Sequence, residues 1–280
     1  TLAERFAQSG AQVLVLDKKA HLAGNCYDYL DVSTGIRVSQ YGAHLFHTNS
    51  QQVWHYLQRF AQWRSYQHQV LVKVGKKLLN LPVNLNTVNQ FFDLQLSKPS
   101  EMRRFLATKI KAIKRVNNGE DYLLSTLGKE LYEAIFENYT LKQWALPAKE
   151  LDPAVVKRNP LRFNRDNRYF TDRYQALPMG GFTDLVNNML NHPNIKLELE
   201  TDFFSWRNTN NLQQFDLVFY SGAIDQYFDY AYGQLEYRSL DFHFSTLKQE
   251  FYQNNAVINY PAAAYPFTRI IEYKHIYPPK

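Results

Sequence analysis

TLAERFAQSG (residues 1–10) followed by AQVLVLD (residues 11–17) is the stretch that decides the fold. The first ten residues have the pattern of a helix that ends in glycine. Val13–Leu16 is a continuous apolar run, which predicts a buried strand, and Asp17 stands at its end. In a dinucleotide-binding βαβ unit, an acidic side chain in this place binds the adenosine ribose, about 20 residues after a glycine-rich turn. We therefore expect an α/β nucleotide-binding fold whose first strand and glycine turn lie upstream of Thr1.

The composition is that of a soluble globular protein, because 45% of the 280 residues are hydrophobic and 21% are charged. The basic residues behind the net charge of +6 are dispersed, and no nucleic-acid-binding motif occurs, so we expect no nucleic acid partner. A single cysteine, Cys26, excludes an internal disulfide and a multi-cysteine zinc site. No apolar run is long enough to span a membrane, and we expect a cytoplasmic protein.

The middle of the chain changes from sheet to helix. Helical spacing predicts a helix within Ser50–Trp63, and the runs VLVKV and KLLNL around Gly75 predict a hairpin over Gln69–Leu81. Ser100 is a candidate N-cap for one of the helices that follow. These helices are predicted over Asn86–Leu94, Ser100–Ile113 and Asp121–Tyr139.

The last part of the chain is predicted as a loop followed by mixed sheet. Pro153–Asp172 is rich in Arg and Asn, which predicts a mobile loop. A short helix, Phe182–Leu190, follows the Gly180-Gly181 pair. Strands are predicted at Ile195–Leu199, Asp216–Tyr220, Tyr237–Phe244, Val257–Tyr260 and Thr268–Tyr273.

Three clusters could carry chemistry. In YGAHLFHT, His44 and His47 either lie beside a cofactor or have structural roles, and no acidic or cysteine neighbour gives metal-ligand spacing, so we predict no metal. YTLKQW places Tyr139 and Trp144 either to clasp a base or a sugar, or to pack in the core. Arginine matches phosphate in a two-pronged geometry, although surface arginines are also usual. The third cluster is Arg158, Arg162, Arg165, Arg168 and Arg173.

The sequence marks no protein nucleophile. It has no nucleophile elbow, P-loop or His-Glu-x-x-His motif, and no obvious Ser-His-Asp order. Side chains that bind and orient, without one that attacks, indicate that a cofactor carries the chemistry.

Taken together, these segments resemble the UDP-galactopyranose mutases, a family of bacterial flavoenzymes. The similarity runs in the family's order through almost all of the chain, and its most specific motifs are GAHLFHT, YTLKQW, RYFTDRYQALPMGG and EYRSL. It implies an isomerase that interconverts UDP-galactopyranose and UDP-galactofuranose for cell-wall polysaccharide synthesis, with reduced FAD as cofactor. In the family, flavin N5 forms an adduct with the anomeric carbon as UDP leaves, and the sugar ring opens and recloses through another hydroxyl.

The resemblance also implies roles for residues of this chain. Arg158 and Arg269 would clamp the diphosphate, and His47 would lie beside the flavin and the substrate. The implied FAD-binding residues are Asp17, Lys18, Gly24, Asn25, His44, Ser221 and Gly222. The implied substrate-binding residues are Tyr139, Thr140, Trp144, Arg158, Tyr169, Phe170, Asn259 and Arg269. A homodimer is expected from the resemblance alone.

The implied architecture is α/β, with an incomplete FAD-binding Rossmann-like domain, a helical insertion domain and a mixed or antiparallel sheet substrate domain. We expect the divisions to fall as follows: the Rossmann-like part at 1–67, a sheet segment at 68–85, the helical domain at 86–150, the arginine loop and return to the sheet at 151–215, and the substrate domain at 216–280.

Two departures from the family pattern matter. Ala23 stands where the family has the first glycine of a Gly-Gly-Asn turn, which is tolerable if φ there stays negative. Segments that the family carries before Thr1 and beyond Lys280 are absent, so we expect an incomplete FAD site and little or no mutase activity from this chain. Two other interpretations stay open: another FAD-dependent oxidoreductase of the same fold, and a UDP-sugar-binding remnant without activity.

Overall fold

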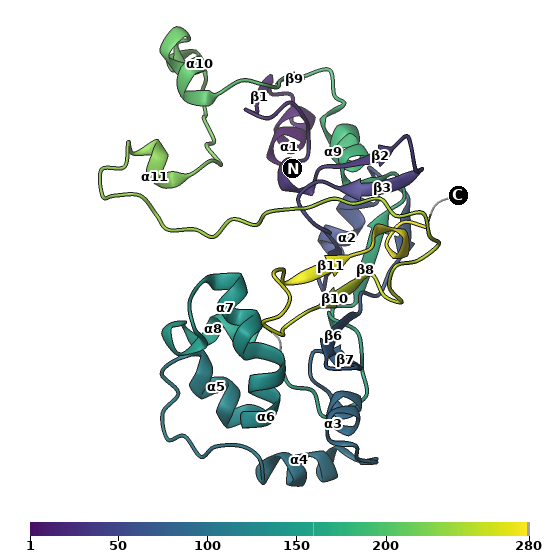
Figure 1. Ribbon diagram of the computed structural model, residues 1–280. Helices are drawn as coiled ribbons and strands as arrows, with labels where there is room; N and C mark the ends of the chain where they lie inside the picture. Colours follow the sequence, from purple (N-terminus) through teal and green to yellow (C-terminus); the bar gives the residue numbers. More distant parts are fainter. Residues whose placement is uncertain (159, 279–280) are drawn as a thin grey trace.

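The computed structural model describes residues 1–158 and 160–278. Its N-terminal part contains the predicted helix and strand: α1 spans Leu2–Gln8 and β1 spans Val13–Leu16. β1 pairs in parallel with β9 (Ile195–Glu198), and α1 packs against both β1 and α9 (Gly181–Leu190), as Figure 1 shows. A parallel strand pair covered by helices is the framework of a nucleotide-binding α/β unit, which confirms the predicted fold class.

Three further sheets are present in the described part of the chain. A hairpin joins β2 (Asp28–Asp31) to β3 (Ile36–Ser39). A three-stranded antiparallel sheet runs in the order β4-β8-β5, and its strands span Phe46–Thr48, Tyr174–Pro178 and Trp63–Ser65. A four-stranded mixed sheet runs in the order β11-β10-β6-β7, and its strands span Arg269–Ile271, Val257–Asn259, Val70–Val74 and Lys77–Leu81. The predicted hairpin over Gln69–Leu81 is therefore confirmed as β6 and β7.

The main hydrophobic core lies between the four-stranded sheet and the helices that follow it. Val72, Leu79, Leu85, Met102 and Leu131 are at most 1% exposed and belong to one buried cluster. The helices between β7 and β8 are α3 (Leu85–Phe92), α4 (Pro99–Ala107), α5 (Gly119–Thr126), α6 (Lys129–Leu131), α7 (Asn138–Trp144) and α8 (Pro153–Lys157). Figure 1 shows them grouped at one end of the molecule, away from β1 and β9.

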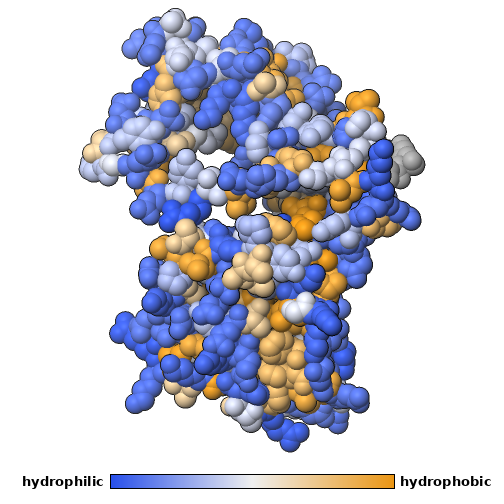
Figure 2. Space-filling model, in the orientation of Figure 1, coloured by the Kyte–Doolittle hydropathy of each residue, from blue (hydrophilic) through white to orange (hydrophobic). Residues whose placement is uncertain are grey.

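The remaining helices are short. α2 (Gln51–Leu57) follows β4 and is shorter than the predicted Ser50–Trp63 helix. α10 (Phe203–Thr209) and α11 (Ile224–Tyr227) lie on a segment that stands away from the body of the chain (Figure 1). Figure 2 shows an opening between this segment and the rest of the molecule. The segment after β9 therefore has few neighbours to pack against.

Helix boundaries differ from prediction where the backbone or a cap dictates them. α4 begins at Pro99, one residue before the proposed cap Ser100, because Pro suits the first helical position and Glu101 accepts hydrogen bonds from the N–H groups of Ser97 and Lys98. The single helix predicted over Asp121–Tyr139 is interrupted at Gly128, which has φ of +83°. After this break the chain forms α6, a π-helical turn (Tyr132–Glu137) and then α7.

Three other predictions need correction. The loop predicted over Pro153–Asp172 begins with helix α8, capped by Asp152, whose carboxylate accepts a hydrogen bond from the Ala154 N–H. The strands predicted at Asp216–Tyr220 and Tyr237–Phe244 do not form: within the described residues, neither segment makes a backbone ladder with a strand. Their apolar side chains are exposed, with Leu217 64% and Tyr237 75% accessible.

Candidate functional site

Two sheet strands and one helix bring Asn259, Arg269 and Tyr139 together. Asn259 and Arg269 are directly paired across the antiparallel strands β10 and β11. The Arg269 guanidinium donates hydrogen bonds to the Tyr139 hydroxyl at 2.5 Å and to Oε1 of Gln143 at 3.4 Å, and both partners lie on α7. Two residues of the YTLKQW motif, Tyr139 and Gln143, therefore bind the side chain of Arg269, one of the arginines predicted to bind the diphosphate.

A pocket beside Arg269 collects several of the predicted substrate-binding residues. Tyr139, Thr140, Trp144, Arg158 and Asn259 all line it. Burial raises the pKa of the Tyr139 hydroxyl, while the positive charges of Arg269 and Arg158 oppose that shift. Both guanidinium groups thus act on one protonated tyrosine, and the pocket wall is electropositive.

Asn259 presents an unused acceptor at this pocket. The residue is 9% exposed, and its Oδ1 atom is buried without a hydrogen-bond partner among the described residues. A buried acceptor left unpaired costs about 1–3 kcal/mol, so a ligand that supplies a hydroxyl or N–H group would recover that cost. Asn259 is therefore suited to accept a hydrogen bond from a ligand's hydroxyl or N–H group.

A second group of predicted residues forms around His47. Its Nδ1 atom lies 2.8 Å from Oδ2 of Asp172, whose other oxygen accepts a hydrogen bond from Asn49 at 2.8 Å. The His47 ring stacks on Phe170, with 3.7 Å between the ring centroids. The carboxylate and the phenyl ring together fix the imidazole plane and leave Nε2 as the atom that can face a ligand.

His68 connects the two groups, and it is a site residue that the sequence analysis missed. It is 5% exposed and lies between Phe170, Tyr169 and Tyr66. Burial lowers the pKa of His68 to about 4, and the nearby charge of Arg269 contributes to that decrease. The imidazole is consequently neutral near pH 7. A lone histidine between two glutamines gave no signal of this position.

The loop after β1 has the geometry of a ligand-binding turn. Oδ1 of Asp17 accepts a hydrogen bond from the Lys19 N–H at 2.9 Å, and Oδ2 has no hydrogen-bond partner among the described residues. Lys19, rather than the predicted Lys18, reaches into the turn: its ammonium donates to Oδ1 of Asn25 at 2.9 Å and lies over the Tyr41 ring. A side chain placed at Gly24 would meet nothing within 4 Å, so the backbone of the turn faces open space.

The condition under which Ala23 would be tolerable, a negative φ, is not met, because its φ is +67° and its ψ is 5°, in the left-handed region. The Ala23 carbonyl accepts a hydrogen bond from the Cys26 N–H at 2.9 Å, which closes the short 3-10 helix Gly24–Cys26. The chain therefore keeps the conformation that a glycine would adopt and accepts the strain of a Cβ there.

Of the other predicted cofactor residues, His44 is held by a contact within the protein, whereas Ser221 and Gly222 are exposed. His44 is held by a 2.9 Å contact between its Nδ1 and the carbonyl of Gly42, where φ is +89° and the aromatic ring of Phe242 packs against the turn. Ser221 and Gly222 are exposed and make no hydrogen bond to the Asp17 turn within the part of the chain that the structure describes. They lie on the segment that carries α11, which stands apart in Figure 1.

Arginines of the predicted phosphate-binding cluster are held by contacts within the protein. Arg162 donates to the carbonyls of Arg168 and Tyr169, and Arg165 donates to Asn86 at 2.6 Å. Asp166 pairs with Arg168, which together with hydrogen bonding lowers the pKa of that carboxyl to about 2. These arginines shape the 162–169 segment, and Arg158 is the member of the cluster that lines the pocket.

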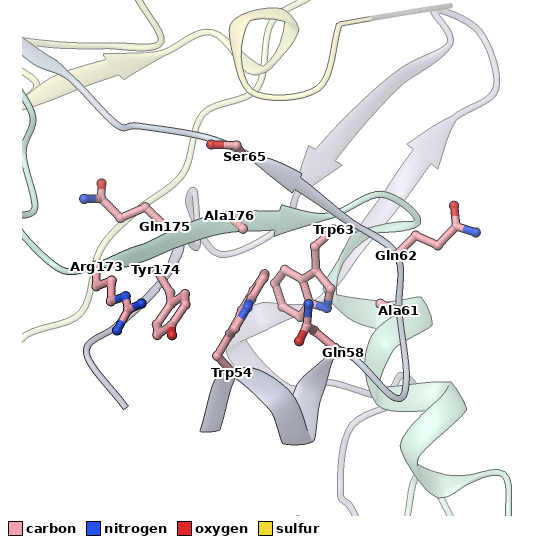
Figure 3. Close-up of a pocket in the computed structure, with 10 residues that line it drawn as sticks. All are labelled: Trp54, Gln58, Ala61, Gln62, Trp63, Ser65, Arg173, Tyr174, Gln175 and Ala176. Carbon is pink, nitrogen blue, oxygen red and sulfur yellow. The ribbon is translucent and has the colours of Figure 1, made fainter. Parts of the chain in front are cut away.

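A larger cleft, of about 450 Å³, lies on the other side of the β4-β8-β5 sheet. Trp54 from α2 stacks on Tyr174 from β8 at 5.4 Å and meets Trp63 edge to face at 5.3 Å. Figure 3 shows these three rings converging, with Arg173 at the rim. Tyr174 and its neighbour Gln175 both line this cleft. The Gln175 amide donates a hydrogen bond to the Asp172 carbonyl at 2.8 Å. Arg173 is the member of the predicted arginine cluster that lines this cleft.

No group of three or more His, Cys, Asp or Glu side chains could hold a metal ion within residues 1–158 and 160–278. No helix in those same ranges is long and apolar enough to cross a membrane.

The parallel β1–β9 pair, its covering helices and the acidic turn define a Rossmann-like nucleotide-binding fold, and residues 1–60 match the family of NAD(P)-binding Rossmann-like domains. Residues 134–280, which carry the arginine, tyrosine and asparagine pocket, match the family described as UDP-galactopyranose mutase. This chain belongs to the UDP-galactopyranose mutase family, as its curated relatives also show.

Those relatives match almost the entire chain. A dTDP-fucopyranose mutase of Escherichia coli is 37% identical over 99% of this chain and 74% of its own length. A Klebsiella pneumoniae protein named "Probable UDP-galactopyranose mutase" is 38% identical over 99% of this chain and 71% of its own length. A solved structure of reduced UDP-galactopyranose mutase shares the fold, with a TM-score of 0.50 and 16% identity over 70% of this chain; the chain spans 45% of that structure's length.

Proposed function

We propose that this chain carries the substrate site of a mutase that interconverts UDP-galactopyranose and UDP-galactofuranose. The observation that supports the proposal best is the pocket of Tyr139, Asn259 and the two arginines Arg158 and Arg269. Two guanidinium groups match the charge and geometry of a diphosphate, and family membership supplies the sugar nucleotide as the ligand.

The chain's own residues would act on the leaving group. Arg158 and Arg269 would stabilise the negative charge that gathers on UDP as its bond to the anomeric carbon breaks. The Tyr139 hydroxyl oxygen accepts a hydrogen bond from Arg269, so its own proton is left to donate to a phosphate oxygen. Asn259 would accept a hydrogen bond from a sugar hydroxyl through its buried Oδ1.

FAD is the cofactor that we propose, and the turn after β1 fits part of it. Asp17 would bind the adenosine ribose through its unpaired oxygen, and the open backbone around Gly24 and Asn25 would lie against the nucleotide. His44 and His47 would lie beside the ring system. When bound in its reduced form, FAD supplies the nucleophile that the protein side chains lack. A homodimer and a cytoplasmic location remain predictions.

The binding half of the proposal is tested by titrating the chain with UDP in a calorimeter. Arg269→Met and Arg158→Met should each weaken binding roughly 10- to 100-fold, the loss typical of a charge-assisted hydrogen bond. Arg165→Met is the matched control, because Arg165 is bound to Asn86 and to the Leu96 carbonyl; it should bind UDP like the wild type. Wild-type protein that binds no UDP would count against a mutase and favour another flavin-dependent enzyme.

The chemical half is tested with reduced FAD and two sugar nucleotides. UDP-galactopyranose and dTDP-fucopyranose are supplied in parallel, because relatives carrying both names are similarly close to this chain. Conversion to the furanose form is followed by chromatography, and bound flavin is measured by its absorbance. Conversion of the UDP sugar supports the proposal, conversion of the dTDP sugar alone replaces its substrate, and UDP binding without any conversion indicates a binding remnant.

A further inference from the structure

The loop between β10 and β11 is organised around a single lysine. The ammonium of Lys142 donates to the carbonyl oxygens of Tyr260 at 2.5 Å, Phe267 at 2.9 Å, and Ala262 and Tyr265 at 3.2 Å each. All four carbonyls belong to residues 260–267, and the lysine reaches them from α7, more than a hundred positions earlier in the chain. The contact is therefore a tertiary clamp rather than a local turn.

The sequence of this loop explains why it needs an external donor. Pro261 and Pro266 have no N–H groups, so the segment YPAAAYPF offers more carbonyls than backbone donors. Its internal backbone bonds are Tyr260 N–H to Thr268 at 2.9 Å and Tyr265 N–H to Ala262 at 3.2 Å. Three aromatic rings pack against one another above it, with centroid distances of 4.9 to 5.7 Å. The Lys142 ammonium supplies hydrogen bonds to four of the loop's carbonyl oxygens.

The two ends of the loop carry the candidate site. Asn259 precedes it and Arg269 follows it, and the two face each other across β10 and β11. On α7, Lys142 lies beside Gln143 and one helical turn after Tyr139, the two residues that hold the Arg269 guanidinium. One helix therefore holds both the arginine and the loop that leads to it.

We infer that Lys142 is a positioning residue: its ammonium clamps loop 260–267 and so fixes Asn259 and Arg269 for the nucleotide sugar, an inference that rests on the proposed function. A direct role on the diphosphate does not fit the geometry. An ammonium has three protons, and four carbonyls at 2.5 to 3.2 Å already engage them. The half-buried side chain also has a lowered pKa because of its burial, as expected for an enclosed amine.

The test substitutes Lys142→Met, which keeps most of the length of the side chain and removes its charge. The matched control is Lys274→Met, because Lys274 also donates to backbone carbonyls, those of Gln249 and Glu250, outside the pocket. Two quantities are measured: the affinity for UDP, and hydrogen exchange of the amides in residues 262–268. Lys142→Met should weaken UDP binding roughly tenfold, equivalent to about 1.4 kcal/mol, and speed exchange in the loop, whereas Lys274→Met should do neither.

Chemical rescue separates positioning from a general loss of structure. Lys142→Ala leaves a cavity that propylammonium, which has the missing atoms, can fill. Millimolar propylammonium should restore slow exchange in residues 262–268 and UDP affinity together, while uncharged propanol should restore neither. Rescue would also identify the effect as local if Lys142→Met were poorly folded.

The outcomes are distinct from those of the proposed function. If wild-type protein binds no UDP, the proposed function fails, while loop exchange still reports whether Lys142 clamps residues 260–267. If wild-type protein binds UDP and Lys142→Met binds it equally well, the positioning role is overturned. Unchanged exchange in the loop of Lys142→Met would overturn the clamp itself.

Discussion

Replacing Ala23 with glycine should stabilise the protein, although the change removes a methyl group. Ala23 has φ of +67° and ψ of 5°, a left-handed conformation that costs a residue with a Cβ roughly 1–2 kcal/mol. Glycine adopts it without that cost, but glycine gains about 0.4–1 kcal/mol of freedom in the unfolded chain. The balance favours Ala23→Gly by roughly 0.5–1 kcal/mol.

The measurement is the free energy of unfolding from urea titration, with two comparison variants. Ala145→Gly changes the other left-handed alanine, which ends α7 with φ of +55°, and should stabilise by a similar amount. Ala154→Gly changes an exposed alanine within helix α8 and should destabilise by about 0.5–1 kcal/mol. If Ala23→Gly destabilised the protein as much as Ala154→Gly, the strain assigned to this turn would be wrong.

Three further predictions concern stability. Gly181→Ala should destabilise the protein by more than about 2 kcal/mol, roughly double the cost of Gly35→Ala, as measured by thermal unfolding. Both glycines have positive φ, but of the two only Gly181 would bring a Cβ to 2.5 Å from the Asp28 carboxylate. Because the pKa of His68 is lowered to about 4, the protein should lose about 3 kcal/mol of its free energy of unfolding as the pH falls from 6.5 to 4. In His68→Leu, the free energy of unfolding from urea titration should depend less on pH over that range. An unchanged pH dependence would refute the assignment. Arg162→Met should destabilise by about 2 kcal/mol, since it leaves the Arg168 and Tyr169 carbonyls unpaired, and proteolysis within residues 162–169 should quicken.

Local sequence patterns predicted the elements whose stability is decided locally. The runs on either side of Gly75 form a hairpin because the turn and the alternation agree, and Val13–Leu16 forms a strand because it is apolar throughout. Asp216–Tyr220 has a similarly apolar pattern and does not form a strand, since a strand needs a partner for its ladder and this segment makes none within the described residues. An apolar run therefore indicates a tendency to form a strand, and a tertiary partner decides whether the strand forms.

The candidate site could be predicted in its parts but not in its connections. The motif around Tyr139 and the arginines Arg158 and Arg269 were each recognisable in the sequence, and the structure brings them to one pocket. Their link through His68 was not recognisable, because burial beside Arg269 depends on residues from three separate strands and loops. The same holds for Lys142, whose partners are backbone carbonyls that carry no sequence signal.

The parallel pairing of β1 with β9 has a consequence for how the chain is made. Val13 is aligned with Ile195, so β1 can form this pair only after residues 195–198 have been synthesised. At a synthesis rate of roughly 5–20 residues per second, that wait lasts about 10 to 40 seconds. Throughout it, the apolar run Val13–Leu16 lacks its β9 partner, which makes it a natural binding segment for a chaperone that acts on nascent chains.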